Sequence, residues 1–161
     1  MSNSETLPTG TRVTRAPVPV DQCGMARASE LIGDRWTLLI LREAFYGVTR
    51  FADMCADLSV PRAVLSQRLD QLVQAEILQL SPYQDAGSRT RFDYRLTEKG
   101  RELALVLLAL MQWGDRYLRD DPAPLKVVDS KTGDTLSVAL ITRTGRVVPL
   151  TRARAVATGP R

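Results

Sequence analysis

The sequence predicts a mainly helical α+β fold, in which four helices, a two-stranded hairpin and a long helix follow one another along the chain. Leucines recur at helical spacing in the middle of the chain, at Leu65, Leu69 and Leu72. Two short segments that alternate apolar and polar residues, 77–83 and 90–96, follow and are separated by an Ala-Gly-Ser turn. A long apolar stripe then precedes Pro122, which is typical of a helix that a proline closes.

Composition excludes several classes of protein. Of the 161 residues, 44% are hydrophobic and 25% are charged, which fits one globular domain with extensions. There is no run of about 18 apolar residues, and the first 20 residues lack the apolar stretch of an export signal, so we expect a cytoplasmic protein without a membrane partner. The sequence contains no histidine and only two cysteines, so a Cys/His zinc site and a histidine general base are not expected. We therefore expect no enzyme activity, no cofactor and no metal site.

The formal net charge of +4 is concentrated at one end of the chain. Residues 143–161 contain five arginines and no acid, which leaves 17 basic and 18 acidic residues in the rest. Bulk charge is therefore a weak indication of nucleic-acid binding, and the inference has to rest on where individual arginines lie.

Local signals predict where the first helices begin and end. Gly33 separates a helix at about 22–32 from a second helix, which Asp34 caps and Gly47 ends. Thr49 is the expected N-cap of a short third helix.

The later elements follow from similar signals. Pro61 fixes its own φ and keeps the preceding residue extended, so the fourth helix is expected over about 61–75. Thr97 is placed to cap the long helix at 98–119. Three short strands are expected at 125–129, 135–142 and 146–150. The predicted organisation is a flexible arm at 1–20, a DNA-binding and dimerisation domain at 21–121, and a small β-hairpin-like extension with a basic tail at 122–161.

This order of elements is the plan of a winged helix-turn-helix, in which one helix enters the major groove of DNA. On the fourth helix, the face opposite the leucines is polar. Arg62 and Gln67 are long donors able to read base edges, and Arg68 on the flank is better placed for a phosphate. The candidate DNA-binding residues of this helix are Arg62, Ala63, Ser66, Gln67 and Arg68. The alternative is an ordinary solvated helix face.

The hairpin and the long helix extend this hypothesis. Arg89 and Arg91 lie at the hairpin tip and on its return strand, where a wing contacts phosphates or the minor groove; the alternative is a solubilising surface hairpin. The long helix carries more apolar surface than so small a domain can bury, so we expect it to form a homodimer. The alternative is that the C-terminal strands cover it. Its stripe consists of Leu103, Val106, Leu107, Leu110, Trp113 and Tyr117.

The stretch from Cys23 to Leu118 resembles the HxlR-type winged helix-turn-helix regulators, which are related in fold to the MarR group. The resemblance implies a dimeric DNA-binding regulator, often a repressor that responds to oxidants, electrophiles or small aromatic compounds, with DNA contacts at Arg62, Ser66, Gln67, Arg68 and Arg91. It rests on LIGDRWTLLILRE (31–43), RFADM (50–54), VLSQRLDQLVQAEIL (64–78), YRLTEKGREL (94–103) and LALMQWGDRYL (108–118).

The chain departs from the family pattern in three places. Glu76 stands where a glycine is usual, and Val60 stands where many members have a serine N-cap. The turns SKTG and TRTG of the extension contain no cysteine, unlike a small hairpin element of some members, so this element cannot be a metal or redox module here.

The resemblance also suggests sites for an effector. Cys23 aligns with a cysteine by which some members sense oxidants, and Arg27 one turn later could favour its thiolate. The alternative is a small residue at a helix start. An effector pocket between the first helices and the long helix would be lined by Trp36, Phe45, Trp113 and Tyr117, although aromatic residues at helical spacing are also typical of plain core. The predicted function is thus a sequence-specific regulator of transcription bound to double-stranded operator DNA, and its alternative is a winged-helix module that contacts only proteins.

Overall fold

The computed structural model describes residue 16, residues 18–87 and residues 89–156. The chain divides into two units, one comprising Ser29–Leu125 and the other comprising the segment up to Ala28 together with Lys126–Arg161. Most of the expected arm, the end of the basic tail and Ser88 in the hairpin turn lie outside the described residues.

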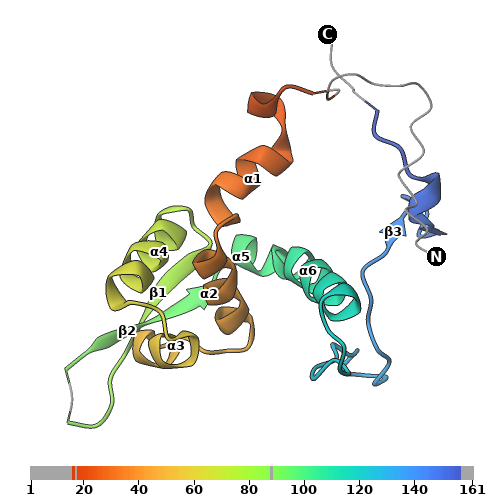
Figure 1. Cartoon of the computed structure of the whole chain (residues 1–161). Coiled ribbons are helices and arrows are strands. Elements are labelled where there is room, and N and C mark those ends of the chain that lie inside the picture. The colour runs from red at the N-terminus through yellow and green to blue at the C-terminus, as the bar shows by residue number, and fades with distance from the viewer. Residues whose placement is uncertain (1–15, 17, 88, 157–161) are drawn as a thin grey trace. The chain divides into compact units, whose positions relative to one another are not determined.

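The larger unit is built on three helices that contact one another in pairs (Figure 1). They are α2 (Arg35–Phe45), α3 (Phe51–Leu58) and α4 (Arg62–Gln74). The predicted leucine stripe of α4 is confirmed, because Leu65, Leu69 and Leu72 are almost fully buried. The whole core consists of Ile32, Ile40, Leu41, Ala44, Met54, Val60, Leu65, Leu69, Leu72, Ile77 and Leu78.

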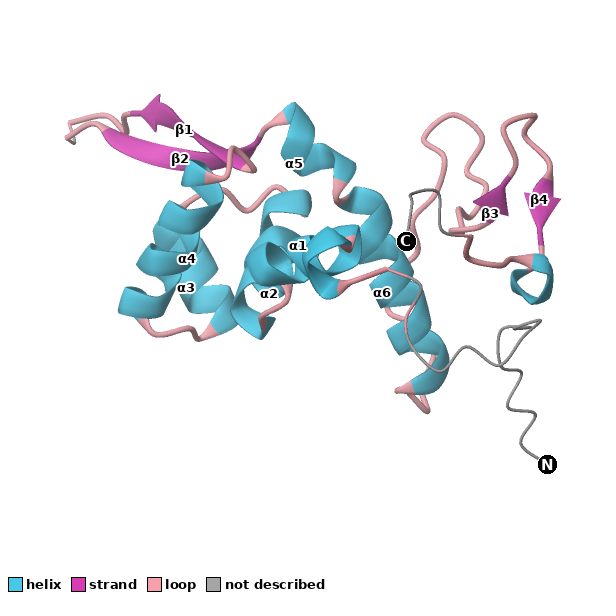
Figure 2. Cartoon of the chain, turned by 90° about the horizontal axis from the view of Figure 1, so that it is seen from above, coloured by secondary structure: helices cyan, strands magenta, loops and turns pink. Residues whose placement is uncertain are grey.

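The predicted hairpin is present and extends the core at one edge. β1 (Leu78–Tyr83) packs on α4 and pairs antiparallel with β2 (Arg91–Leu96). In both views the turn of the hairpin projects away from the helices (Figure 2). Phe92 does not follow the predicted alternation: it lies opposite Pro82 in the outer half of the hairpin and is 52% exposed, whereas its neighbour Asp93 is buried.

Several helix boundaries differ from the prediction by one or two residues. α1 (Gly24–Ile32) begins after a 3-10 turn at Val20–Gln22. The N-cap of α3 is Arg50 rather than Thr49, because the Thr49 carbonyl accepts a hydrogen bond from the Tyr94 amide of the hairpin instead. The N-cap of α4 is Pro61, which offers no side-chain cap.

The helix ends at Gly47 and Glu76 have the same geometry but different residues. After α2, the Gly47 and Val48 amides bond back to the carbonyls of Ala44 and Glu43. After α4, the Glu76 and Ile77 amides bond back to Val73 and Leu72 in the same pattern, a Schellman motif. In this motif the residue directly after the helix C-cap has a positive φ, which is 85° at Gly47 and 58° at Glu76. The usual family glycine is therefore replaced by a residue whose Cβ makes this conformation unfavourable.

Replacing Glu76 with glycine is expected to raise the free energy of unfolding by about 1 kcal/mol, because glycine adopts the left-handed conformation without steric cost. Urea denaturation of the variant and the wild-type chain measures the difference. The control is Gln74→Gly, at the last residue of α4, which is expected to lower stability by up to about 1 kcal/mol. A Glu76→Gly variant less stable than the wild type would contradict this explanation.

The predicted long helix is present but is divided at one residue. Thr97 caps α5 (Glu98–Glu102) by accepting a hydrogen bond from the Gly100 amide, as predicted. Leu103 then separates α5 from α6 (Ala104–Tyr117). No residue of α6 is buried, and no helix of the described residues is long and apolar enough to cross a membrane.

The C-terminal extension contains less strand than predicted. Its regular pairs are an isolated bridge between Val128 and Thr135 and a short hairpin of β3 (Leu140–Ile141) with β4 (Val147–Val148). A 3-10 turn at Leu150–Arg152 follows. Gly133 and Gly145, the last residues of the SKTG and TRTG turns, both have positive φ. None of the described residues of the extension is buried.

Candidate nucleic-acid interface

The exposed face of α4 carries the residues that were predicted to read DNA. Arg62, Ala63, Ser66 and Gln67 are all exposed, on the side away from the buried leucines. The Arg62 guanidinium lies 5.0 Å from the centre of the Phe51 ring, a cation–π contact with the first residue of α3. This contact holds the arginine at the start of α4, where the first turn of a recognition helix meets the groove.

The hairpin beside α4 exposes two more arginines. Arg89 and Arg91 are both exposed, near the tip and at the start of β2. The hairpin is held by Arg50, whose guanidinium lies 4.3 Å from the Tyr83 ring centre and 3.2 Å from a carboxylate oxygen of Asp85. Desolvation by its neighbours lowers the pKa of the exposed Arg50, but the charges of Asp85 and Tyr83 and the hydrogen bond to Asp85 outweigh it and raise the pKa above its ordinary value. This contact was not predicted from the sequence, because Arg50 and Asp85 are far apart along the chain and come together only in the folded structure.

The base of the hairpin lies against the same helix. Tyr94 of β2 is half-buried, and burial raises the pKa of its hydroxyl, with a smaller contribution from the negative charge of Asp70 on α4. The hairpin and the exposed face of α4 therefore belong to one continuous structure within the larger unit.

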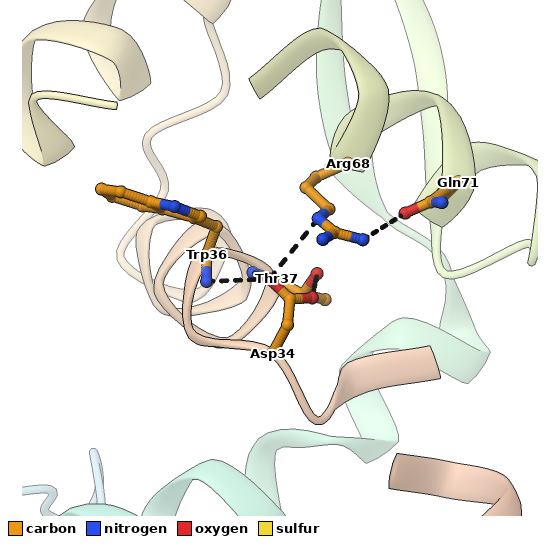
Figure 3. A network of polar contacts seen from close by, with 5 residues as sticks. All are labelled: Asp34, Trp36, Thr37, Arg68 and Gln71. Atoms are coloured by element: carbon orange, nitrogen blue, oxygen red, sulfur yellow. Dashed lines mark hydrogen bonds and ion pairs between the residues drawn. The ribbon is translucent and has the colours of Figure 1, made fainter. Parts of the chain in front are cut away.

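Arg68 lies differently from the other predicted DNA-binding residues. Its side chain is 30% exposed and points from α4 towards the start of α2 (Figure 3). Its Nε atom lies 3.4 Å from Asp34 Oδ1, and its Nη1 donates a hydrogen bond of 2.9 Å to Gln71 Oε1. The structure thus brings Arg62, Ala63, Ser66 and Gln67 together on one face but places Arg68 at the boundary with α2.

Asp34 acts as the N-cap of α2, as the sequence predicted. Its Oδ1 accepts hydrogen bonds from the amides of Trp36 (3.0 Å) and Thr37 (3.2 Å), and its Oδ2 accepts one from the Thr37 hydroxyl. Burial by itself raises the pKa of the Asp34 carboxyl, but the hydrogen bonds from Thr37 and Trp36 and the charge of Arg68 together lower the pKa below its usual value. The carboxylate is therefore charged at neutral pH.

The four aromatic residues proposed for an effector pocket lie on two helices, Trp36 and Phe45 on α2 and Trp113 and Tyr117 on α6. Trp113 and Tyr117 are neighbours on α6, with ring centres 5.7 Å apart, and both are more than half exposed. Trp36 lies under Arg35 and is half-buried, as is Phe45. A shallow groove of about 750 Å³ lies elsewhere, where α4, β1 and α5 meet, and none of the four lines it.

Cys23 lies between the 3-10 turn and α1 and is half-buried. The expected partner Arg27 is engaged differently, because its guanidinium donates two hydrogen bonds, of 3.2 and 3.1 Å, to the backbone carbonyl of Asp21. Cys55 packs against the core, and its Sγ lies 3.4 Å from the Val60 carbonyl.

Comparison with known proteins agrees with this geometry. The family model described as HxlR-like helix-turn-helix matches residues 31–122. Rv3095 of Mycobacterium tuberculosis (strain ATCC 25618 / H37Rv), named as an uncharacterised HTH-type transcriptional regulator, is 46% identical over 118 residues, which cover 73% of this chain and 73% of the relative.

Solved structures show the same likeness. PA1607, described as a candidate transcription factor, matches with a TM-score of 0.72 and 32% identity over 84% of this chain and 94% of that one. The reduced form of the transcriptional regulator YodB from B. subtilis matches with a TM-score of 0.51 and 26% identity over 62% of this chain and 97% of that one. The chain belongs to the HxlR-like helix-turn-helix family of DNA-binding transcriptional regulators, which are not enzymes.

Proposed function

We propose that the chain is a homodimeric repressor that recognises a specific sequence of double-stranded DNA through α4 and the β1–β2 hairpin. The observation that carries the proposal is the polar face of α4, exposed directly beside a hairpin that presents arginines. A helix fits the major groove, where Arg62 can read guanine, Gln67 can read adenine and Ala63 can contact a thymine methyl. Ser66 suits a base or a phosphate, and Arg89 and Arg91 suit phosphates or the minor groove.

The uncovered apolar side of α6 supports the dimer. Leu103 and Leu107 pack towards the core, whereas Val106, Leu110 and Trp113 on the other side are 44%, 48% and 56% exposed. Apolar residues exposed at spacings of three and four suit packing against a second helix. A symmetric pair would present two α4 helices to half-sites about 34 Å apart, or a multiple of that. Such a dimer bound across a promoter represses by occupying it.

Selection of DNA sequences by the purified protein tests the proposal. A duplex library of random sequence is put through repeated selection with the purified protein, and binding of the selected duplex is then titrated in rising salt. We expect one palindromic sequence to be enriched and log K to fall linearly and steeply with log salt, because phosphate contacts release counterions. A module that contacts only proteins would enrich no sequence and show no such salt dependence.

Replacing Arg91 with glutamine is expected to reduce the slope of log K against log salt by about 1.8, because each phosphate contact contributes about 0.9 and a dimer has two hairpins. Fluorescence anisotropy at five or more salt concentrations measures the slope. Arg143→Gln, which removes one exposed charge from the extension, is the matched control. Equal slopes for Arg91→Gln and the wild type would remove this residue from the interface.

We further propose that a thiol oxidant, an electrophile or a small aromatic effector releases the DNA, with Cys23 as the candidate sensor and Trp36, Phe45, Trp113 and Tyr117 as candidate effector contacts. The similar YodB structure is that of a reduced form, which supports a search for a thiol-dependent state here. Oxidation of Cys23 in both subunits would form an intersubunit disulfide, with two electrons and two protons passing to the oxidant. In footprinting with and without diamide, Cys23→Ser is expected to stay bound while the wild type is released. Release of both proteins alike would eliminate the cysteine as sensor.

A further inference from the structure

The contact between Arg68 and Asp34 joins the candidate recognition helix to the start of α2. Arg68 is the one candidate DNA-binding residue of α4 that is half-buried, and its Nε atom is buried without a hydrogen-bond partner among the described residues. The charge of Asp34, 3.4 Å away, is what compensates this buried donor. In Figure 3 the guanidinium points to Asp34, with Gln71 beside it.

Asp34 is a rigid partner for this contact. Two backbone amides and the hydroxyl of Thr37 bond to its carboxylate, and Thr37 itself is 2% exposed. Because the carboxylate cannot turn away without breaking the cap of α2, it holds the Arg68 guanidinium at one place. The buried leucines hold α4 on the core through apolar contacts, which are not directional. The ion pair is directional, so it can restrict how α4 is angled over α2.

The pair also depends on Asp34 for its electrostatics. The start of a helix carries a partial positive charge, so a guanidinium is unfavourable beside the first turn of α2 unless a carboxylate separates them. Without the negative charge, Arg68 would have to leave its half-buried position, and only the non-directional apolar contacts of the buried leucines would then set the angle of α4 over α2.

We propose that Asp34 is a positioning residue for DNA recognition: it engages the charge of Arg68, and this pair sets the presentation of Arg62, Ser66 and Gln67 to the bases. Arg68 then acts through Asp34 and does not neutralise a phosphate. The inference rests on the proposed DNA binding and adds a residue outside α4 and the hairpin to the determinants of specificity.

The test compares Asp34→Asn, Arg68→Met, the double variant and Arg68→Lys. Asparagine caps a helix as well as aspartate does, so Asp34→Asn removes the charge and keeps the cap. Anisotropy gives the affinity of each variant for the selected duplex and for a random duplex, over a range of salt. We expect Asp34→Asn and Arg68→Met each to lower the ratio of selected to random affinity about tenfold, and the double variant to lose no more than either. The salt slope should stay unchanged in all of them, and Arg68→Lys, which keeps the ion pair, should stay within about threefold of the wild type.

The opposite assignment gives opposite results. If Arg68 neutralised phosphates, Arg68→Met would reduce the salt slope by about 1.8 per dimer. Asp34→Asn would then free the arginine and raise the affinity for both duplexes. Either result would overturn the proposal, as would additive losses in the double variant. Arg68→Met retains Asp34 and the cap, so it keeps the test decisive even if Asp34→Asn folds poorly.

The control for net charge is Asp57→Asn, an exposed carboxylate on α3 with no ion pair among the described residues. It is expected to leave the ratio of the two affinities unchanged. A wild-type chain that bound no duplex would refute the proposed function itself, whereas normal wild-type binding with an unaltered ratio in Asp34→Asn and Arg68→Met would refute only the positioning role.

Discussion

Replacing both Leu110 and Trp113 with aspartate is expected to leave the chain monomeric and to weaken its binding to the selected duplex by about 100-fold or more. The two residues lie in the middle of the exposed row on α6, between Val106 and Tyr117. Burial of such side chains contributes about 25 cal/mol for each Å² of apolar surface removed from water. Two aspartates per subunit would have to lose their hydration in the same interface, which costs several times that gain.

The effect on DNA binding is expected to exceed the loss of any single DNA contact. When one subunit is bound, the second α4 faces its half-site at an effective concentration in the millimolar range, and avidity of this kind is worth about 10²–10⁴ in affinity. A monomer loses this factor although its α4 and hairpin are intact. The variant should therefore retain weak, salt-dependent binding.

Sedimentation equilibrium measures the mass of the variant and the wild type, and anisotropy measures their affinities. The control is Tyr46→Asp, which places an acid at an exposed aromatic residue just after α2, outside the exposed row on α6. A monomeric wild type, together with a loss of thermal stability in the double variant, would mean that the apolar side of α6 is covered within one chain. A double variant that remained dimeric would place the interface elsewhere.

Elements whose signals lie within a few residues could be predicted from the sequence. The leucines of α4 repeat every three or four residues, so their burial followed from helical geometry. The caps at Asp34 and Thr97 could also be predicted, because each cap side chain accepts a hydrogen bond from an amide two or three residues later. The exposed face of α4 could then be predicted as the face opposite these leucines.

Contacts between distant segments could not be predicted in this way. Arg68 was expected at a phosphate because nothing near it in sequence shows that Asp34, across two helices, lies 3.4 Å away. Alternation suggested that Phe92 faces the core, but the core ends before the outer half of the hairpin. Arg27 was paired with Cys23 by spacing alone, whereas the fold offers it the Asp21 carbonyl.

Replacing Gly100 with alanine is expected to lower the free energy of unfolding by about 3 kcal/mol, the upper part of the range for inserting a group into a filled site. Gly100 is buried in α5, and a Cβ built on it would lie 2.2 Å from the Ile77 carbonyl oxygen and 3.1 Å from Cδ2 of Leu96. No rotation of a side chain relieves the first contact, because the obstacle is backbone. The helix would have to move away from the start of the hairpin.

That movement would break the polar contacts that hold α5 in place. The Thr97 hydroxyl donates to the Glu76 carbonyl at 2.6 Å, and the Thr97 amide donates to the Ile77 carbonyl at 3.1 Å. Lys99 Nζ donates to the Ala75 carbonyl at 2.7 Å. Each hydrogen bond contributes about 1 kcal/mol, and alanine recovers at most about 1 kcal/mol through its higher helix propensity. The free energy lost with these hydrogen bonds therefore exceeds the free energy gained from the higher helix propensity of alanine.

Thermal and urea unfolding measure this loss, and a fall in Tm of at least about 12 °C is expected for a unit of this size. Gly24→Ala, at a helical glycine with open space around the added Cβ, should be neutral or slightly stabilising. Because α5 connects the hairpin to α6, the same displacement should also shift α6, the helix proposed to pair the subunits, relative to α4, so DNA affinity should fall even below the unfolding temperature. A Gly100→Ala chain as stable as the wild type would mean that α5 can slide over the Ile77 carbonyl, and that the angle between the hairpin and α6 is not set at this contact.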